Sequence, residues 1–164
     1  MYTTLWVTFL VAFVVSLLVT PLAIKLAPKI GAMDVPRDGR RMHVKAMPRF
    51  GGMAIFAGTM ISTVIFLLQL DNRIVGILIG GALIYILGII DDLKNLPAKV
   101  KFLGQTVIAI LMYMYDIRIE FISNFFGEGK SELGTVLCFI VTIIWIVGIT
   151  NTVNLIDGLD GLAA

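Results

Sequence analysis

The chain alternates between long apolar segments and short polar ones, and this pattern predicts its secondary structure. A helix needs roughly 20 apolar residues to cross a hydrocarbon core about 30 Å thick. Five apolar segments approach this length and predict five transmembrane helices, over residues 3–24, 51–70, 74–90, 100–119 and 133–150. We therefore expect an all-α integral membrane protein.

Two other interpretations of these segments fit the sequence less well. Five successive helices that are apolar on every face are not typical of helices or strands buried in a soluble core. A cleaved signal peptide carries its basic residues before the apolar stretch, whereas Lys25 and Lys29 follow the first segment. Composition agrees with a membrane protein, because 59% of the 164 residues are hydrophobic and only 15% are charged. Soluble domains contain about 25% charged residues, and the mean hydropathy here is +0.98.

The distribution of Lys and Arg predicts the orientation in the membrane. Residues 25–50 hold seven of them and residues 91–101 hold three, whereas the opposite loops hold Arg73, Arg118 and Lys130. Cytoplasmic loops are enriched in Lys and Arg. We therefore expect the loops 25–50, 91–101 and 151–164 in the cytoplasm, with the N-terminus outside. The expected location is the cell membrane, with several passes and a functional site on the cytoplasmic face.

Three polar clusters fall on this predicted cytoplasmic side. The first contains Asp34, the second contains Asp91 and Asp92, and the third is the segment "NTVNLIDGLDG" at residues 151–161. Ionisable residues near membrane depth are functional candidates by default. Carboxylates alone would repel an anionic substrate, whereas Mg²⁺ accepts protein oxygens and substrate phosphates together. Carboxylates, amides and lysines on one side therefore favour phosphate chemistry at a membrane face.

Each cluster also has a simpler interpretation when it is taken alone. Asp91 and Asp92, followed by Lys94, fit a solvated helix end with a local ion pair. Asn154 and Asp157 are residue types that cap a following helix. A calcium loop is discounted, because "DGLDGLAA" has Leu where that motif requires ligands. These interpretations do not explain why all three clusters face one side.

Three segments resemble, in the same order, signatures of the polyprenyl-phosphate N-acetylhexosamine-1-phosphate transferases (glycosyltransferase family 4): "DVPRDGRRMHVKAMPRFGG", "GIIDDLKNLPAKVK" and "NTVNLIDGLDGLA". The resemblance implies a multi-pass membrane enzyme of which residues 1–164 are the N-terminal portion of a single domain. It implies transfer of a sugar 1-phosphate from a UDP-sugar to undecaprenyl phosphate, with release of UMP and dependence on Mg²⁺, or on Mn²⁺ as the alternative ion. Pro48-Arg49 before Gly51-Gly52 resembles the N-acetylglucosamine-1-phosphate transferases of teichoic acid and surface polysaccharide synthesis.

The resemblance also implies roles for individual residues. Asp91 and Asp92 are the expected catalytic residues beside the acceptor phosphate, and one of them is the candidate general base. Asn154 and Asp157 are the expected metal ligands. Substrate contacts are expected of Asp34, Lys45, Lys101, Asn151, Asp157 and Asp160. The expected partners are undecaprenyl phosphate, UDP-N-acetylglucosamine and the lipid bilayer, with a second copy of the chain as a candidate and no nucleic acid.

Two alternative functions stay open at this point. One is a phospho-N-acetylmuramoyl-pentapeptide transferase of peptidoglycan synthesis, although those enzymes tend to carry Thr in place of Arg49. The other, from a different class, is a fragment of an ion-coupled transporter, which would place its acids near the bilayer midplane. The resembled family has about twice as many helices, a later aspartate in a Gly-Asp motif and a His-rich loop. We therefore expect the protein to continue beyond Ala164.

Overall fold

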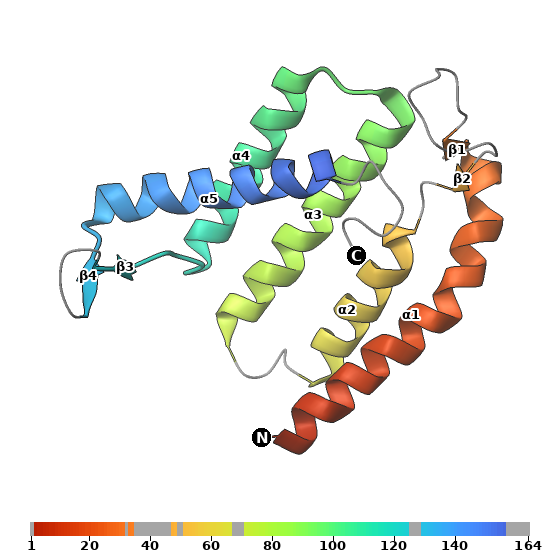
Figure 1. The fold of residues 1–164 in the computed structure, drawn as a ribbon, viewed down its shortest axis with the longest axis horizontal. Helices are drawn as coiled ribbons and strands as arrows, with labels where there is room; N and C mark the ends of the chain where they lie inside the picture. The colour runs from red at the N-terminus through yellow and green to blue at the C-terminus, as the bar shows by residue number, and fades with distance from the viewer. Residues whose placement is uncertain are drawn as a thin grey trace. The chain divides into compact units, whose positions relative to one another are not determined.

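The computed structural model describes residues 2–31, 33–34, 47–48, 51–66, 71–124 and 129–156. These residues form a mostly helical structure with two short hairpins (Figure 1). The helices are α1 (Tyr2–Ile30), α2 (Gly52–Phe66), α3 (Asn72–Lys94), α4 (Ala98–Met114) and α5 (Thr135–Ile156). The strands are β1 (Met33–Asp34) paired with β2 (Met47–Pro48), and β3 (Phe121–Ser123) paired with β4 (Lys130–Glu132).

Each predicted apolar segment overlaps with one of the five helices. Three of them, α1, α3 and α5, are long and apolar enough to cross a membrane. As described, α2 has 15 residues and α4 has 17, which at 1.5 Å per residue is short of a typical hydrocarbon core. The prediction of a mostly helical chain with helices long and apolar enough to cross a membrane is therefore confirmed. The number of spans and their orientation stay predictions.

The end of the fourth helix differs from the prediction. A helix was expected over residues 100–119, but α4 begins at Ala98 and ends at Met114. Asp116 has a φ of 62°, in the left-handed region that a right-handed helix cannot include. The chain then runs into β3, whose residues pair antiparallel with β4. Neither hairpin was predicted.

Three other helices are longer than their predicted segments. α1 continues to Ile30, through residues that were assigned to a loop. α3 continues to Lys94 and includes the two aspartates that were expected to follow it. α5 continues to Ile156, so that Asn151 and Asn154 are helical. Polar side chains at a helix end can reach water, so hydropathy marks the apolar part of these helices and not their hydrogen-bonded ends.

The described residues within 1–74 and 88–96 form one compact unit, in which α1 packs against α2. The buried side chains of these two helices are small: Ala23, Ala27, Ala54 and Ser62. Ser16 donates a hydrogen bond from Oγ to the backbone oxygen of Ala54 at 3.0 Å. Small residues allow helix backbones to approach closely in a membrane, where packing rather than water drives association.

The described residues within 75–87 and 97–164 form a second compact unit. It contains the middle of α3, α4, the β3–β4 hairpin and α5, with α5 packed against α4. A side chain added at Gly80 of α3 would meet Met112 of α4, so the absence of one permits this close approach. This unit holds the polar residues of α4 and α5 on which the functional argument depends.

Thr142 ties the segment after α4 to α5. Its side chain is only 1% exposed. Oγ1 donates to the backbone oxygen of Cys138 at 2.7 Å and accepts from the backbone N–H of Ile119 at 2.9 Å. A single hydroxyl therefore satisfies a backbone donor that lies outside any helix or strand.

We expect Thr142→Val to destabilise the second unit. The replacement keeps the side-chain shape but leaves the Ile119 N–H without this acceptor, which costs about 1–3 kcal/mol. Thermal unfolding in detergent measures the loss. Thr152→Val is the matched control, because Thr152 is exposed and its hydroxyl bonds only to Gly148 of its own helix. Equal melting temperatures for the two variants would contradict the role given to Thr142.

Candidate functional site

The predicted catalytic aspartates lie in the last turn of α3. Asn95 follows with φ 48° and ψ 67°, a left-handed C-cap whose N–H donates to the backbone oxygen of Asp91 at 2.7 Å. Asn is one of the few residues that adopt this conformation readily. The Leu96 N–H then donates to Oδ1 of Asp91 at 3.1 Å. The turn after α3 thus holds the Asp91 carboxylate in a defined place.

Asp91 and Asp92 occupy different environments. Adjacent helical residues point about 100° apart, and Asp91 is half-buried whereas Asp92 is exposed. Both lie at the C-terminal end of the helix dipole, where a negative charge is unfavourable. The hydrogen bond from Leu96 offsets this for Asp91. The helix dipole alone therefore does not favour two acids at this position, which is where the catalytic pair is predicted.

A second group of predicted residues lies where α4 begins and α5 ends. Lys101 is half-buried in the first turn of α4. Asn151 of α5 donates from Nδ2 to Oε1 of Gln105, one turn after Lys101, at 2.6 Å. The same Nδ2 donates to the backbone oxygen of Val147 at 2.8 Å. The hydrogen bond between Asn151 and Gln105 connects the start of α4 with the end of α5 inside the second unit.

Gln105 was not among the predicted site residues. Its side chain is 3% exposed, and it lies inside a helix whose neighbours are mostly apolar. A polar residue within a predicted transmembrane segment is rare and is a functional candidate by default. That rule, applied to an uncharged amide as well as to acids, could have singled it out.

The remaining predicted residues have different outcomes. Asn154 is exposed on α5, three residues after Asn151. The backbone of Asp34 lies in β1, opposite Met47 of β2. Lys45, Asp157 and Asp160 lie outside the described residues. Asp91 and Asp92 belong to the first unit and Lys101 and Asn151 to the second, so the convergence of the three clusters stays a prediction.

The predicted Mg²⁺ site lies only partly within the described residues. In the part of the chain that the structure describes, no three His, Cys, Asp or Glu side chains lie close enough to hold a metal ion. One predicted ligand, Asn154, supplies an amide oxygen, and the other, Asp157, lies outside that part. Amide and carboxylate oxygens are the ligands that Mg²⁺ prefers. The metal site stays a prediction.

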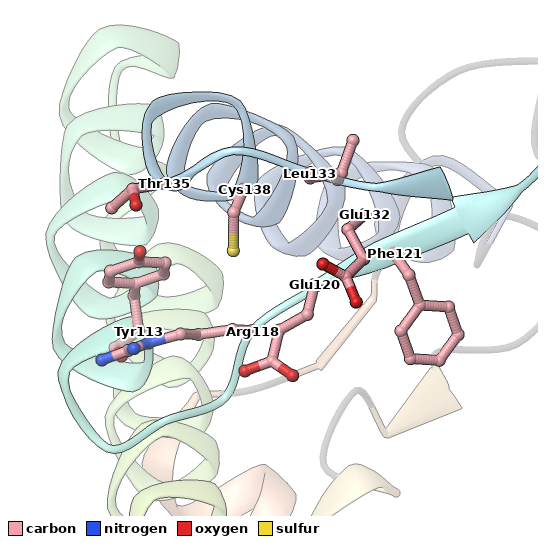
Figure 2. Close-up of a pocket in the computed structure, with 8 residues that line it drawn as sticks. All are labelled: Tyr113, Arg118, Glu120, Phe121, Glu132, Leu133, Thr135 and Cys138. Carbon is pink, nitrogen blue, oxygen red and sulfur yellow. The ribbon is translucent and has the colours of Figure 1, made fainter. Parts of the chain in front are cut away.

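A separate pocket of about 350 Å³ lies at the end of α4 where Tyr113 is located (Figure 2). It is lined by Tyr113, Arg118, Glu120, Phe121, Glu132, Leu133, Thr135 and Cys138. None of the predicted site residues lines it. The Arg118 guanidinium bonds to the Asp116 carboxylate at 2.8 Å and lies 4.6 Å from the centre of the Tyr113 ring. Its charge is therefore engaged by neighbours, and the pocket is not an evident anion site.

The fold and these residues define a helical membrane protein with acids and amides at helix ends. The chain belongs to glycosyl transferase family 4, whose sequence profile matches residues 74–164. The matched region contains Asp91, Asp92 and the segment from Asn151 to Asp160. The family expected from the sequence motifs is confirmed.

Three relatives illustrate the similarity. The chain is 44% identical over 136 residues to the "Probable undecaprenyl-phosphate N-acetylglucosaminyl 1-phosphate transferase" of Bacillus subtilis (strain 168), covering 83% of the chain and 37% of the relative. It is 34% identical over 148 residues to the decaprenyl-phosphate N-acetylglucosaminephosphotransferase of Mycobacterium tuberculosis (strain ATCC 25618 / H37Rv), covering 84% and 36%. It is 34% identical over 156 residues to the phospho-N-acetylmuramoyl-pentapeptide-transferase of Carboxydothermus hydrogenoformans, covering 83% and 47%. The chain thus spans little more than a third of the length of the first two relatives.

Proposed function

We propose that this chain is part of a membrane enzyme that transfers N-acetylglucosamine 1-phosphate from UDP-N-acetylglucosamine to undecaprenyl phosphate. The observation that carries the proposal is the family match over residues 74–164, which contains both acidic motifs predicted to form the site. The relative from Bacillus subtilis, at 44% identity, is named as a probable undecaprenyl-phosphate N-acetylglucosaminyl 1-phosphate transferase. Initiation of teichoic acid or surface polysaccharide synthesis is the role we propose for the product.

The reaction is a phosphoryl transfer in which few covalent tasks fall to the protein. An oxygen of the lipid phosphate attacks the phosphorus that carries the sugar, and the bond from that phosphorus to the bridging oxygen breaks. UMP leaves with the bridging oxygen. Positioning of the two phosphates and stabilisation of the developing charge supply most of the rate in such reactions. One displacement and a two-step route through an aspartyl intermediate are both compatible with these residues.

The residues of this chain have defined tasks in the proposed site. Asp91 and Asp92 lie beside the lipid phosphate, where one serves as general base. Lys101 and Lys45 place positive charge near the phosphates, and Asp34, Asn151, Asp157 and Asp160 contact the substrates. Asn154 and Asp157 would hold Mg²⁺, which when bound neutralises phosphate charge. We propose that the site faces the cytoplasm, because the excess of Lys and Arg predicts that side for these loops. A second copy of the chain stays a candidate partner.

The competing functions differ in what they require. The Carboxydothermus relative, which is 34% identical, is named as a phospho-N-acetylmuramoyl-pentapeptide-transferase. The higher identity to the N-acetylglucosamine relative and the Pro48-Arg49 pair favour the proposed donor. A transporter would need acids near the bilayer midplane, whereas Asp91 and Asp92 lie in the last turn of α3.

We expect membranes containing the protein, expressed from its complete reading frame, to release UMP from UDP-N-acetylglucosamine. Release should require added undecaprenyl phosphate and Mg²⁺, because removing the ion leaves the phosphate charges unbalanced at the site. A chelator should reduce the rate to background, and renewed Mg²⁺ should restore it. Coupled detection of UMP measures the rate, with membranes lacking the protein as control.

The donor in the same assay separates the alternatives. Release of UMP from UDP-N-acetylmuramoyl-pentapeptide alone would identify the protein as a phospho-N-acetylmuramoyl-pentapeptide transferase instead. No release from either donor, with the protein shown to be inserted in the membrane, would contradict the proposed function and leave a transporter as the better interpretation.

A further inference from the structure

A partly buried amide pair joins α4 to α5 within the second unit. Gln105 is 3% exposed, and Asn151 is half-buried. Nδ2 of Asn151 lies 2.6 Å from Oε1 of Gln105 and 2.8 Å from the backbone oxygen of Val147. Polar groups that are buried without partners are costly, so this pair is held by the hydrogen bonds that it makes.

The direction of the Asn151 amide follows from the chemistry of its neighbours. A backbone carbonyl can only accept, so the Asn151 atom that faces the Val147 oxygen must be the NH₂ group. The Gln105 atom 2.6 Å from that NH₂ must in turn be the amide oxygen. Amide oxygen and nitrogen are often assigned only from their surroundings, and here the backbone acceptor removes the ambiguity.

These two hydrogen bonds fix what Asn151 can offer. Both hydrogens of its NH₂ group are committed, one to α4 and one to its own helix. The amide oxygen Oδ1 therefore faces away from both acceptors. An amide oxygen has two lone pairs and accepts hydrogen bonds from hydroxyl or N–H groups. Asn151 is thus held as an acceptor and cannot turn its NH₂ group outward without losing two bonds.

We propose that Gln105 is a positioning residue that holds the Asn151 amide with Oδ1 presented, as a hydrogen-bond acceptor, to the sugar-nucleotide substrate. The inference rests on the proposed function, in which Asn151 contacts the substrate. Gln105 is buried and acts only through Asn151. It links the start of α4, which carries Lys101, to the segment that continues toward Asp157 and Asp160.

The test compares three variants of the protein expressed from its complete reading frame. Gln105→Leu removes the acceptor while keeping a similar volume, and we expect the KM for UDP-N-acetylglucosamine to rise about tenfold, as for the loss of one hydrogen bond. Gln105→Glu retains a carbonyl oxygen at the same position and should stay near the wild-type KM. Thr106→Val is the matched control, because the Thr106 hydroxyl bonds only to Phe102 of its own helix.

A double-mutant cycle separates positioning from a general structural role. In an Asn151→Ala background, Gln105→Leu should raise the KM no further, because the side chain through which it acts is gone. An unchanged KM for Gln105→Leu, or the same rise in both backgrounds, would overturn the proposal. A KM for Gln105→Glu as high as that for Gln105→Leu would also overturn it.

The melting temperatures of the same variants test the contact independently of the reaction. If the wild-type protein released no UMP, the proposed function would fail together with the substrate role of Asn151, and this second measurement would still test the contact between Gln105 and Asn151. Coupled effects of Gln105→Leu and Asn151→Ala on stability would support the contact. Additive effects would overturn it.

Discussion

Replacement of Asp91 or Asp92 by Asn is expected to lower sugar-phosphate transfer by about two orders of magnitude or more, the size of a lost general base or charged group at the reacting phosphate. Asn has nearly the same shape as Asp but carries no negative charge and cannot accept a proton. Formation of polyprenyl-diphosphate-sugar in membranes containing the protein, expressed from its complete reading frame, measures the loss.

The structure shows why Asn is the informative replacement at Asp91. Oδ1 of Asp91 accepts from the Leu96 N–H at 3.1 Å, and the amide oxygen of Asn can accept the same bond. Asp91→Asn therefore removes the charge and retains the turn that ends α3. Asp91→Ala removes both, so a further loss of stability in this variant alone would report the contribution of the hydrogen bond.

The other end of α3 supplies a control that has the same chemistry. Asp71 is the N-cap of this helix, and its Oδ1 accepts from the Arg73 N–H at 2.9 Å. Asp71→Asn likewise removes a carboxylate and keeps a cap acceptor, at a position predicted to lie outside the cell. We expect nearly wild-type transfer for this variant. Wild-type transfer by both Asp91→Asn and Asp92→Asn would contradict the catalytic assignment.

Hydropathy predicted the helices because the length of an apolar segment is a property of the sequence alone. It failed at the end of α4 because apolar residues continue beyond the helix. Ile117, Ile119 and Phe121 alternate with the charged residues Arg118 and Glu120. Alternation with period two indicates a strand rather than a helix. The extended segment that leads into β3 was therefore visible in the sequence, but it was too short to outweigh the apolar run before it.

The sequence predicted which residues belong to the candidate site but not which residues they contact. Asp91 and Asn151 were identified because acids and amides are unusual beside apolar helices. The partner of Asn151 lies 46 positions earlier in the chain, and no sequence period connects the two helices. The hydrogen bond from the Leu96 N–H to Asp91 likewise depends on the left-handed conformation of Asn95. Such contacts come from the packing of helices and turns, which one sequence does not reveal.

The packing of α1 against α2 leads to the second large expected effect, at Gly58. This residue is buried in α2, and a Cβ atom there would meet Oγ of Ser16 and the backbone oxygen of Ala12 on α1. The Ser16 side chain can rotate, but the backbone of α1 can yield only if the helices separate. Separation would also break the hydrogen bond from Ser16 to the backbone oxygen of Ala54.

We expect Gly58→Leu to destabilise the protein by about 1–3 kcal/mol or more through overpacking. The stability of Gly58→Ala should lie between those of the wild-type protein and Gly58→Leu. Thermal or denaturant unfolding of the protein in detergent measures this loss of stability. Thr59→Leu is the matched control, because the adjacent side chain is exposed on another face of α2 and an added Leu meets no helix backbone there. Equal stability of the two Leu variants would mean that α1 and α2 do not depend on close backbone approach. A selective loss at Gly58 would show that the small residues of this contact set the distance between the helices.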